Sequence, residues 1–322
     1  MGFLVVATDP LHADFSGELE ELAVIGAEFR AAQCRTEEDV AKVCRDADGI
    51  MATFSPVGRR ALAGMPRCRI VVRTGVGYDT IDVAAATERR VMVANVPDYC
   101  ISEVADHALA LMLCLWRKVV ELDAQVRAHG WTGMLRPVHR LEGRVLGIIG
   151  LGRIGRAVAV RARGFGCRRI ACDPYAPADV FSALGVESVS LDVLARSADI
   201  ITLHTPLTPE TRGLMRKEIL RQMKPSAILV NTSRGGVVTT QDLVQALREG
   251  WISGAGLDVF EAEPLPQDHP LRNLPRVLLT PHAAWYSVDS EEELRRRCAR
   301  TVVQALRGEV PASLVNPEVL TR

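Results

Sequence analysis

Three side chains able to carry out acid–base and anion-binding chemistry follow apolar runs. Arg234 lies in "VNTSRGG", Glu263 in "GLDVFEAEP" and His282 in "TPHAAWYS". Hydride transfer to a 2-oxo acid needs a cation for the carboxylate, which arginine binds bidentately. The carbonyl oxygen must also gain a proton, and histidine is the natural donor near neutral pH. A carboxylate beside the other ring nitrogen would keep that histidine protonated and oriented. Arg234, His282 and Glu263 match these three roles in that order.

Each of these residues also has an ordinary interpretation when taken alone. An arginine after a strand is often a surface ion pair, a glutamate before a proline can face solvent, and a turn histidine can be satisfied locally. Their common place at strand ends favours chemistry, because the carboxyl ends of parallel strands meet at one edge of a sheet. Asp258, on the same strand end as Glu263, is a candidate acceptor for a nicotinamide carboxamide.

A glycine-rich stretch gives a reason to expect a nicotinamide. In "VLGIIGLGRIG", Gly150 permits a tight turn, Gly152 lets the main chain approach a pyrophosphate, and Gly155 lets the following helix pack on the strand. Asp173, 18 residues after Gly155, would accept hydrogen bonds from the adenosine ribose and repel a 2′-phosphate. The stretch therefore predicts NAD rather than NADP. The alternative is a turn in an α/β domain that binds no nucleotide.

Strand and helix signals alternate along most of the chain, which predicts parallel sheets covered by helices. An apolar helix is expected from a cap at Ser102 through Trp116. A charged helix is expected near the C-terminus, with Asp289 or Ser290 as cap and Gly308 as its end. In the second half of the chain, starting with the strand that leads into the glycine motif, strands are expected at residues 145–150, 168–173, 199–204, 227–232, 253–258 and 276–280.

The late position of the glycine motif predicts an inserted domain. Because the C-terminal helix is expected to return to the N-terminal α/β unit, residues 1–98 and 288–322 would form one discontinuous, flavodoxin-like substrate-binding domain. Residues 99–287 would form a Rossmann-type NAD-binding domain. The fold class is thus α/β, with two parallel sheets, each flanked by helices.

Composition argues against several other classes of protein. The 39 basic and 39 acidic residues balance, which disfavours nucleic-acid or membrane-surface binding that depends on bulk charge. The most apolar stretch, residues 108–116, is about half the length that spans a bilayer. The eight cysteines form no C-x-x-C pair, so no metal site is expected, and reduced thiols in a cytoplasm are the simplest interpretation.

These motifs resemble the D-isomer-specific 2-hydroxyacid dehydrogenases over roughly the whole chain, through "GLGRIG", "LHTPLTPETRGL", "NTSRGG", "GAGLDVFEAEP" and "PHAAWYS". The resemblance implies that Arg234, Glu263 and His282 are catalytic. It also implies that backbone N–H groups of Val76 and Gly77, in "TGVGYD", bind the substrate carboxylate. The expected cofactor contacts are Gly150, Gly152, Arg153, Ile154, Gly155, Asp173, His204, Thr205, Pro206, Thr211, Thr232, Ser233, Arg234, Asp258 and His282.

Two further residues concern the substrate. The run "HAAWYS" resembles the C-terminal-binding-protein branch of this family, where a tryptophan lines the substrate pocket, so Trp285 would contact the substrate side chain. The alternative is a hinge aromatic. Arg73, before "TGVGYD", could hold an anionic substrate, and the alternative is a surface charge beside a strand. The sequence does not select among the candidate substrates, which are glyoxylate, hydroxypyruvate, pyruvate, a phosphorylated acid and a bulkier aromatic oxo acid.

The resemblance also bears on partners. It implies a homodimer formed through the helix that matches residues 102–122. A different class of function is an NAD(H)-sensing scaffold with little turnover, resembling the corepressors of the same branch. His107 lies four residues after Glu103, so the two share a helix face, and the pair is expected at a subunit interface or between domains rather than in catalysis.

Overall fold

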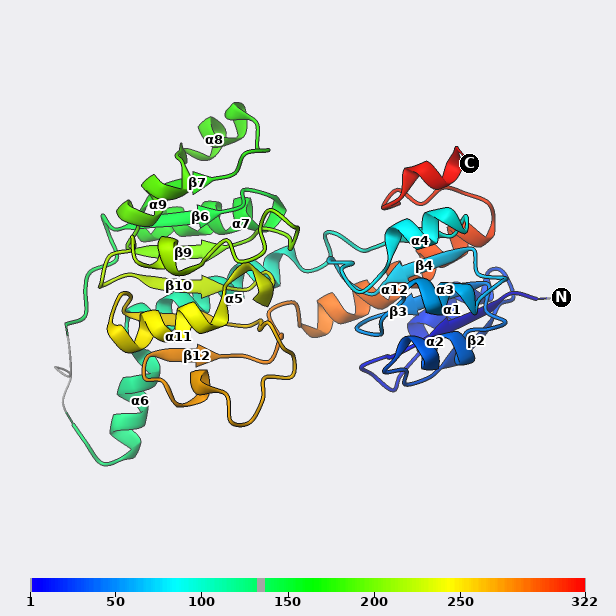
Figure 1. The fold of residues 1–322 in the computed structure, drawn as a ribbon, viewed down its shortest axis with the longest axis horizontal. Helices are drawn as coiled ribbons and strands as arrows, with labels where there is room; N and C mark the ends of the chain where they lie inside the picture. The colour runs from blue at the N-terminus through cyan, green and yellow to red at the C-terminus, as the bar shows by residue number, and fades with distance from the viewer. Residues whose placement is uncertain (1, 132–136, 322) are drawn as a thin grey trace. The chain divides into compact units, whose positions relative to one another are not determined.

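The computed structural model describes residues 2–131 and 137–321. Its contacts divide the chain into two compact units (Figure 1). The first unit joins Met1–Tyr99 to Ser287–Arg322, and the second unit is Cys100–Tyr286. The first unit is therefore discontinuous in sequence, and the second unit is inserted into it.

The first unit contains a sheet of five parallel strands in the order β2-β1-β3-β4-β5. This is the flavodoxin-like strand order. Its inner strands are short and fully buried, as expected for strands covered on both faces. The strands are β1 (Leu4–Ala7), β2 (Glu28–Ala31), β3 (Gly49–Ala52), β4 (Ile70–Arg73) and β5 (Met92–Ala94).

Helices cover the first sheet. One apolar cluster joins strand residues to α2, α3 and α4, while α1 packs against α12, which also contacts β3 and β4. The N-cap of α12 is Ser287, whose hydroxyl accepts from Ser290 N, and not Asp289 or Ser290 as expected. The helices are α1 (Ser16–Ala23), α2 (Glu37–Val43), α3 (Arg59–Ala63), α4 (Val83–Glu88) and α12 (Val288–Leu306), with a 3-10 turn, η4 (Pro317–Leu320).

The second unit contains seven parallel strands in the order β12-β11-β10-β9-β6-β7-β8. Counted from β6, this is the Rossmann order 3-2-1-4-5-6 extended by one strand, and it reverses between β6 and β9. The strands are β6 (Val145–Ile149), β7 (Arg168–Cys172), β8 (Glu187–Ser188), β9 (Ile200–Leu203), β10 (Ile228–Asn231), β11 (Gly254–Leu257) and β12 (Val277–Leu279).

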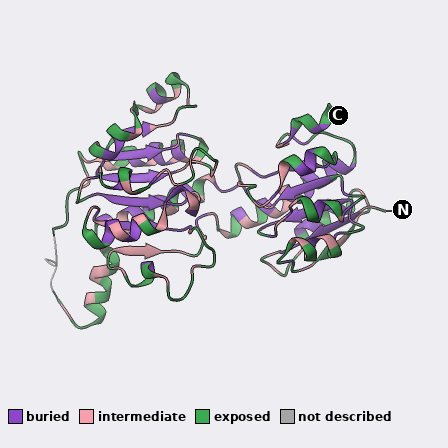
Figure 2. Cartoon of the chain, in the orientation of Figure 1, coloured by how far each residue is buried: buried purple, intermediate pink, exposed green. Residues whose placement is uncertain are grey.

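Alternate residues of these strands enter two separate cores. Leu146 and Ile148 of β6 pack with α5, α7 and α8, whereas Ile149 packs with α9, α10 and α11. The central strands are accordingly buried on both faces (Figure 2). The helices are α5 (Ile101–Trp116), α6 (Val119–Arg127), α7 (Arg153–Ala162), α8 (Ala178–Leu184), α9 (Leu191–Ser197), α10 (Lys217–Leu220) and α11 (Thr240–Glu249), with 3-10 turns η1 (Arg163–Phe165), η2 (Gly235–Val237) and η3 (Pro270–Asn273).

The helical segment near residues 102–122 differs from the expectation in two ways. It is broken after Trp116, because Lys118 adopts the left-handed conformation with φ of 56°, and α6 begins at Val119. Ser102 is not the cap of α5, since the helix begins one residue earlier and the Ser102 hydroxyl instead accepts a hydrogen bond from Arg161 Nη2 at 2.6 Å. No helix in the described part of the chain has the length and apolarity to cross a membrane.

Candidate active site

The candidate residues of the second unit lie in loops that leave the carboxyl ends of its strands. The glycine loop follows β6, Asp173 follows β7, His204 follows β9, and Thr232 and Arg234 follow β10. Asp258 and Glu263 follow β11, and His282 follows β12. Because all seven strands are parallel, these loops share one edge of the sheet.

The glycine loop has the shape that a dinucleotide pyrophosphate requires. Gly150 has φ of 90°, and a Cβ there would lie 2.6 Å from His204 O. A Cβ on Gly155 would lie 2.0 Å from Gly150 O, so only glycine lets α7 begin this close to β6. Gly152 is the N-cap of α7, and a Cβ there would meet nothing within 4 Å. The start of α7, at Arg153 and Ile154, is thus open to an anion at the positive end of the helix.

Asp173 ties the end of β7 to the glycine loop. Its Oδ2 accepts from Leu151 N at 2.7 Å, and its Oδ1 accepts from Tyr175 N at 2.8 Å and Ala176 N at 3.1 Å. These bonds fix the carboxylate beside the glycines, where an adenosine ribose would lie in a dinucleotide-binding unit. Its negative charge suits the 2′-hydroxyl of NAD.

Two buried polar atoms at the same edge lack a partner among the described residues, namely His204 Nδ1 and Thr232 Oγ1. Such atoms are rare in folded proteins unless a ligand or water satisfies them. Burial lowers the pKa of His204 to about 3, so its ring is neutral at physiological pH. Its Nε2 is 2.9 Å from Thr202 Oγ1. Together with the glycine loop, these atoms fit a bound dinucleotide.

The "TPLTPET" turn is held by its own side chains. The hydroxyl of Thr211 donates to Pro206 O at 2.6 Å and accepts from Thr208 N at 2.8 Å. The hydrogen of Thr211 is therefore used inside the turn. Thr211 would therefore contribute to cofactor binding indirectly, by holding the loop that carries Thr205 and Pro206 in shape.

Arg234 is presented by a residue that the sequence did not single out. Asn231, only 1% exposed, accepts from Ser233 N at 3.0 Å and Ser233 Oγ at 2.8 Å, and donates to Arg234 O at 2.9 Å. A Cβ on Gly235 would lie 1.9 Å from the carbonyl carbon of Phe260, so the loops after β10 and β11 touch through this glycine. In the sequence, this arrangement is signalled only by an asparagine placed directly after the apolar run "AILV".

Glu263 and His282 form a pair. His282 Nδ1 lies 2.7 Å from Glu263 Oε2, and Glu263 Oε1 accepts from Phe260 N at 2.9 Å. Burial raises the pKa of Glu263, but the hydrogen bond and charge of His282, the Phe260 N–H and the charge of Arg234 together bring it below its ordinary value of 4.5. Glu263 is therefore a carboxylate at neutral pH, and it orients the ring of His282.

Asp258 holds the turn that carries His282. It is 1% exposed; its Oδ1 accepts from Ala283 N at 2.9 Å and its Oδ2 from Ala284 N at 2.9 Å. The backbone N–H of His282 donates to Asp258 O at 2.8 Å. His282 itself has φ of 56°, which non-glycine residues adopt only when surrounding contacts impose it. The role of Asp258 visible in the structure is thus to fix this turn.

In the first unit, the "TGVGYD" loop leaves the carboxyl end of β4. Asn95 Nδ2 donates to Val76 O at 2.6 Å. Within residues 2–131 and 137–321, no acceptor takes the N–H groups of Val76 and Gly77. Arg73 is 7% exposed and donates to Thr74 O at 2.7 Å, which contradicts its interpretation as a surface charge. Its guanidinium occupies the place that a Cβ on Gly75 would need.

Trp285 lies two residues before Ser287, the N-cap of α12, and is the second-last residue of the second unit. Its ring is half-buried and makes an edge contact with Tyr286, with centroids 5.6 Å apart.

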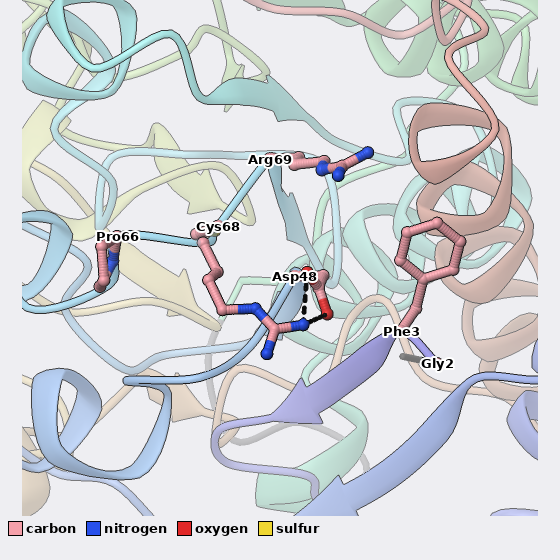
Figure 3. Close-up of a pocket in the computed structure, with 7 residues that line it drawn as sticks. Gly2, Phe3, Asp48, Pro66, Cys68 and Arg69 are labelled. Atoms are coloured by element: carbon pink, nitrogen blue, oxygen red, sulfur yellow. Dashed lines mark hydrogen bonds and ion pairs between the residues drawn. The ribbon is translucent and has the colours of Figure 1, made fainter.

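A pocket of about 480 Å³ in the first unit contains none of these residues. It lies at the amino ends of β1, β3 and β4, and Asp48 there is paired with Arg67 at 2.9 Å (Figure 3). Asp48 also accepts from Leu4 N at 2.9 Å. This is the edge of the sheet opposite to the "TGVGYD" loop, and the carboxylate of Asp48 is already paired with Arg67.

Comparison with known proteins agrees with the fold and the glycine loop, which define a dinucleotide-binding α/β protein. Residues 109–284 match the family described as D-isomer specific 2-hydroxyacid dehydrogenase, NAD binding domain. The chain is 45% identical to a glyoxylate reductase of Korarchaeum cryptofilum, over 86% of this chain and 85% of that one. It is 38% identical to a D-3-phosphoglycerate dehydrogenase of Methanocaldococcus jannaschii, over 97% of this chain and 59% of that one.

A solved structure extends the comparison. The D-lactate dehydrogenase from Aquifex aeolicus, crystallised with NAD and lactic acid, is 28% identical, with a TM-score of 0.88 over 97% of this chain and 98% of that one. The chain belongs to the D-isomer-specific 2-hydroxyacid dehydrogenases. It is an NAD-dependent oxidoreductase, as the sequence predicted. These relatives lend no support to the C-terminal-binding-protein branch suggested by Trp285.

Proposed function

We propose that the protein interconverts a 2-oxo acid and the D-2-hydroxy acid, with His282 as general acid and base. The observation that carries this proposal is the 2.7 Å pair of His282 Nδ1 and Glu263 Oε2, at the same sheet edge as the loop of Arg234. NAD, when bound, supplies or accepts the hydride. Gly150, Gly152 and Gly155 would hold it, with Asp173 toward the ribose.

The pairing decides which ring nitrogen exchanges the proton. Because Glu263 is a carboxylate, it accepts from Nδ1–H, which leaves Nε2 to face the substrate. His282 therefore gives a proton from Nε2 to the carbonyl oxygen as the oxo acid is reduced, and takes it back in the reverse reaction. The guanidinium of Arg234 binds the substrate carboxylate and carbonyl, which places the reacting carbon.

For the first unit we propose a substrate-binding role, with the second as the NAD-binding domain. The N–H groups of Val76 and Gly77 suit a carboxylate, and Asn95 holds their loop in shape. Arg73, buried at the base of that loop, adds positive charge for an anionic substrate. Trp285 would contact the substrate side chain.

We propose a small 2-oxo acid, glyoxylate first, as substrate, on the basis of the relatives named glyoxylate reductase. The test measures NADH oxidation with glyoxylate, hydroxypyruvate, pyruvate, phosphohydroxypyruvate and phenylpyruvate. Glyoxylate is expected to have the highest kcat/KM, and acids with a larger side chain are expected to yield the D-enantiomer. Tight NADH binding without oxidation by any of these acids would contradict the proposal and favour the NAD(H)-sensing scaffold.

We also propose a homodimer formed through the segment of α5 and α6. No residue of α6 is buried, and its Val119 and Val120 are each about half exposed, at 50% and 49%. Sedimentation equilibrium is expected to give twice the chain mass of 35.1 kDa. Lysine at both valines should yield the monomer, whereas Val160→Lys, on exposed Val160 of α7, should not. A wild-type protein that sediments as a single chain would refute this interface.

A further inference from the structure

His107 reaches from α5 to the turn that carries His282. Its Nε2 lies 3.0 Å from Thr280 Oγ1, across 173 residues of sequence, and 3.7 Å from Asp258 Oδ1. Its side chain is 25% exposed. The sequence suggested a pair with Glu103 at an interface or between domains. In the structure, His107 contacts Thr280, directly after the end of β12, within its own unit.

The hydrogen bonds of this group have a fixed direction. The hydroxyl of Thr280 donates to Asp258 Oδ1 at 2.6 Å. A hydroxyl carries a single hydrogen, so against His107 the Thr280 oxygen can only accept. His107 must therefore carry a proton on Nε2. The result is a directed chain from His107 through Thr280 to the buried carboxylate of Asp258.

That chain ends on the atoms that shape the His282 turn. Asp258 uses both carboxylate oxygens and its main-chain oxygen to bind the N–H groups of Ala283, Ala284 and His282. Because His282 holds a φ of 56°, the turn depends on these contacts to keep its conformation. If the Thr280 hydroxyl no longer donates to the buried carboxylate of Asp258, that carboxylate loses a hydrogen bond and holds the His282 turn less firmly.

We propose that His107 is a positioning residue for proton transfer. It orients the Thr280 hydroxyl, which holds Asp258, which in turn holds the backbone that presents His282 to Glu263. The position of His107 relative to Thr280 is fixed, because α5, which carries His107, packs against β10, β11 and β12. The inference rests on the proposed acid–base function of His282.

The test compares substitutions that remove or keep the donor. His107→Leu is expected to lower kcat about tenfold, since misplacing a reacting group by a fraction of an ångström has effects of this order. The KM for the oxo acid and the Kd for NADH should stay within about twofold of wild type. His107→Gln, whose amide nitrogen can replace Nε2, should recover most of kcat. Thr280→Val and Thr280→Ser should behave as the same kind of pair.

A double variant shows whether His107 and Thr280 act through the same series of hydrogen bonds. His107→Leu combined with Thr280→Val should cost about the same tenfold as either change alone, because each breaks the same path. Gly164→Ala, which lies outside α5 and α6 and adds a Cβ that meets nothing within 4 Å, serves as the control and should leave kcat and Tm unchanged. Thermal unfolding of every variant identifies any that fails to fold, and the threonine pair then carries the test alone.

Three outcomes would overturn the inference: unchanged kcat in His107→Leu, no recovery in His107→Gln, or a double variant whose loss is the product of the single losses. These results differ from a failure of the proposed function. If His282→Asn inactivates the enzyme while His107→Leu does not, only the positioning role is wrong. If His282→Asn keeps full turnover, the acid–base assignment itself is wrong.

Discussion

Asparagine in place of His282 is expected to lower kcat for 2-oxo acid reduction by about 10² to 10⁴-fold, the range that a general acid contributes. Asparagine is the matched replacement for two reasons. It tolerates the positive φ of 56° at this position, so the turn should be kept. Its amide can still donate to Glu263 while lacking any group at the place of Nε2. Steady-state kinetics with NADH and glyoxylate would measure the loss.

The same variant should bind NADH within about threefold of wild type, as measured by fluorescence titration. His269→Asn is a suitable control, because His269 caps η3 through Leu271 N, a bond that asparagine can also make. Its kcat should not change. A parallel loss of NADH affinity and turnover in His282→Asn would show that the residue acts on cofactor binding rather than on proton transfer. A kcat equal to wild type would remove His282 from the mechanism.

Gly152→Ala is expected to weaken NADH binding about ten- to a hundredfold while leaving Tm unchanged. The substitution fits the protein itself, because a Cβ there meets nothing within 4 Å and φ is −69°. What it obstructs is the approach of a phosphate to the first N–H groups of α7. A lost hydrogen bond to a charged group is worth about 1.5–3 kcal/mol, which corresponds to that range of affinity.

Two other glycines make this experiment specific. Gly164→Ala adds a Cβ that also meets nothing within 4 Å, and it should change neither affinity nor Tm. Gly155→Ala places a Cβ 2.0 Å from Gly150 O, so it should lower Tm by distorting the start of α7. If Gly152→Ala binds NADH as tightly as wild type, the glycine loop does not face the pyrophosphate in the way proposed.

Much of the fold could be predicted from short segments. The six strands expected after residue 144 each match an observed strand within about one residue at either end. The central strands β6, β9, β10 and β11 are buried on both faces, so their sequences are mostly apolar and easy to recognise. The edge strands β2 and β8 have mostly exposed residues and no apolar run, so nothing in their sequence distinguishes them from loops.

Helix ends were predicted less well. Ser287 and Ser290 both lie near the start of α12, and each could cap a helix. The choice of Ser287 depends on the reciprocal bonds between the two serines once the chain has left the second unit. The break at Lys118 has no local signal either, because lysine rarely adopts a positive φ.

The sequence by itself determined the class of fold, the cofactor and the residue types of the candidate site, because apolar runs, glycines at fixed spacing and strand-end polar residues are local features. Only the tertiary structure decided that His107 contacts Thr280, that Asp258 is committed to the His282 turn, and that Asn231 presents Arg234. These contacts depend on which strands are neighbours and in which register. Strand order is set by packing of the whole sheet, which no short segment encodes.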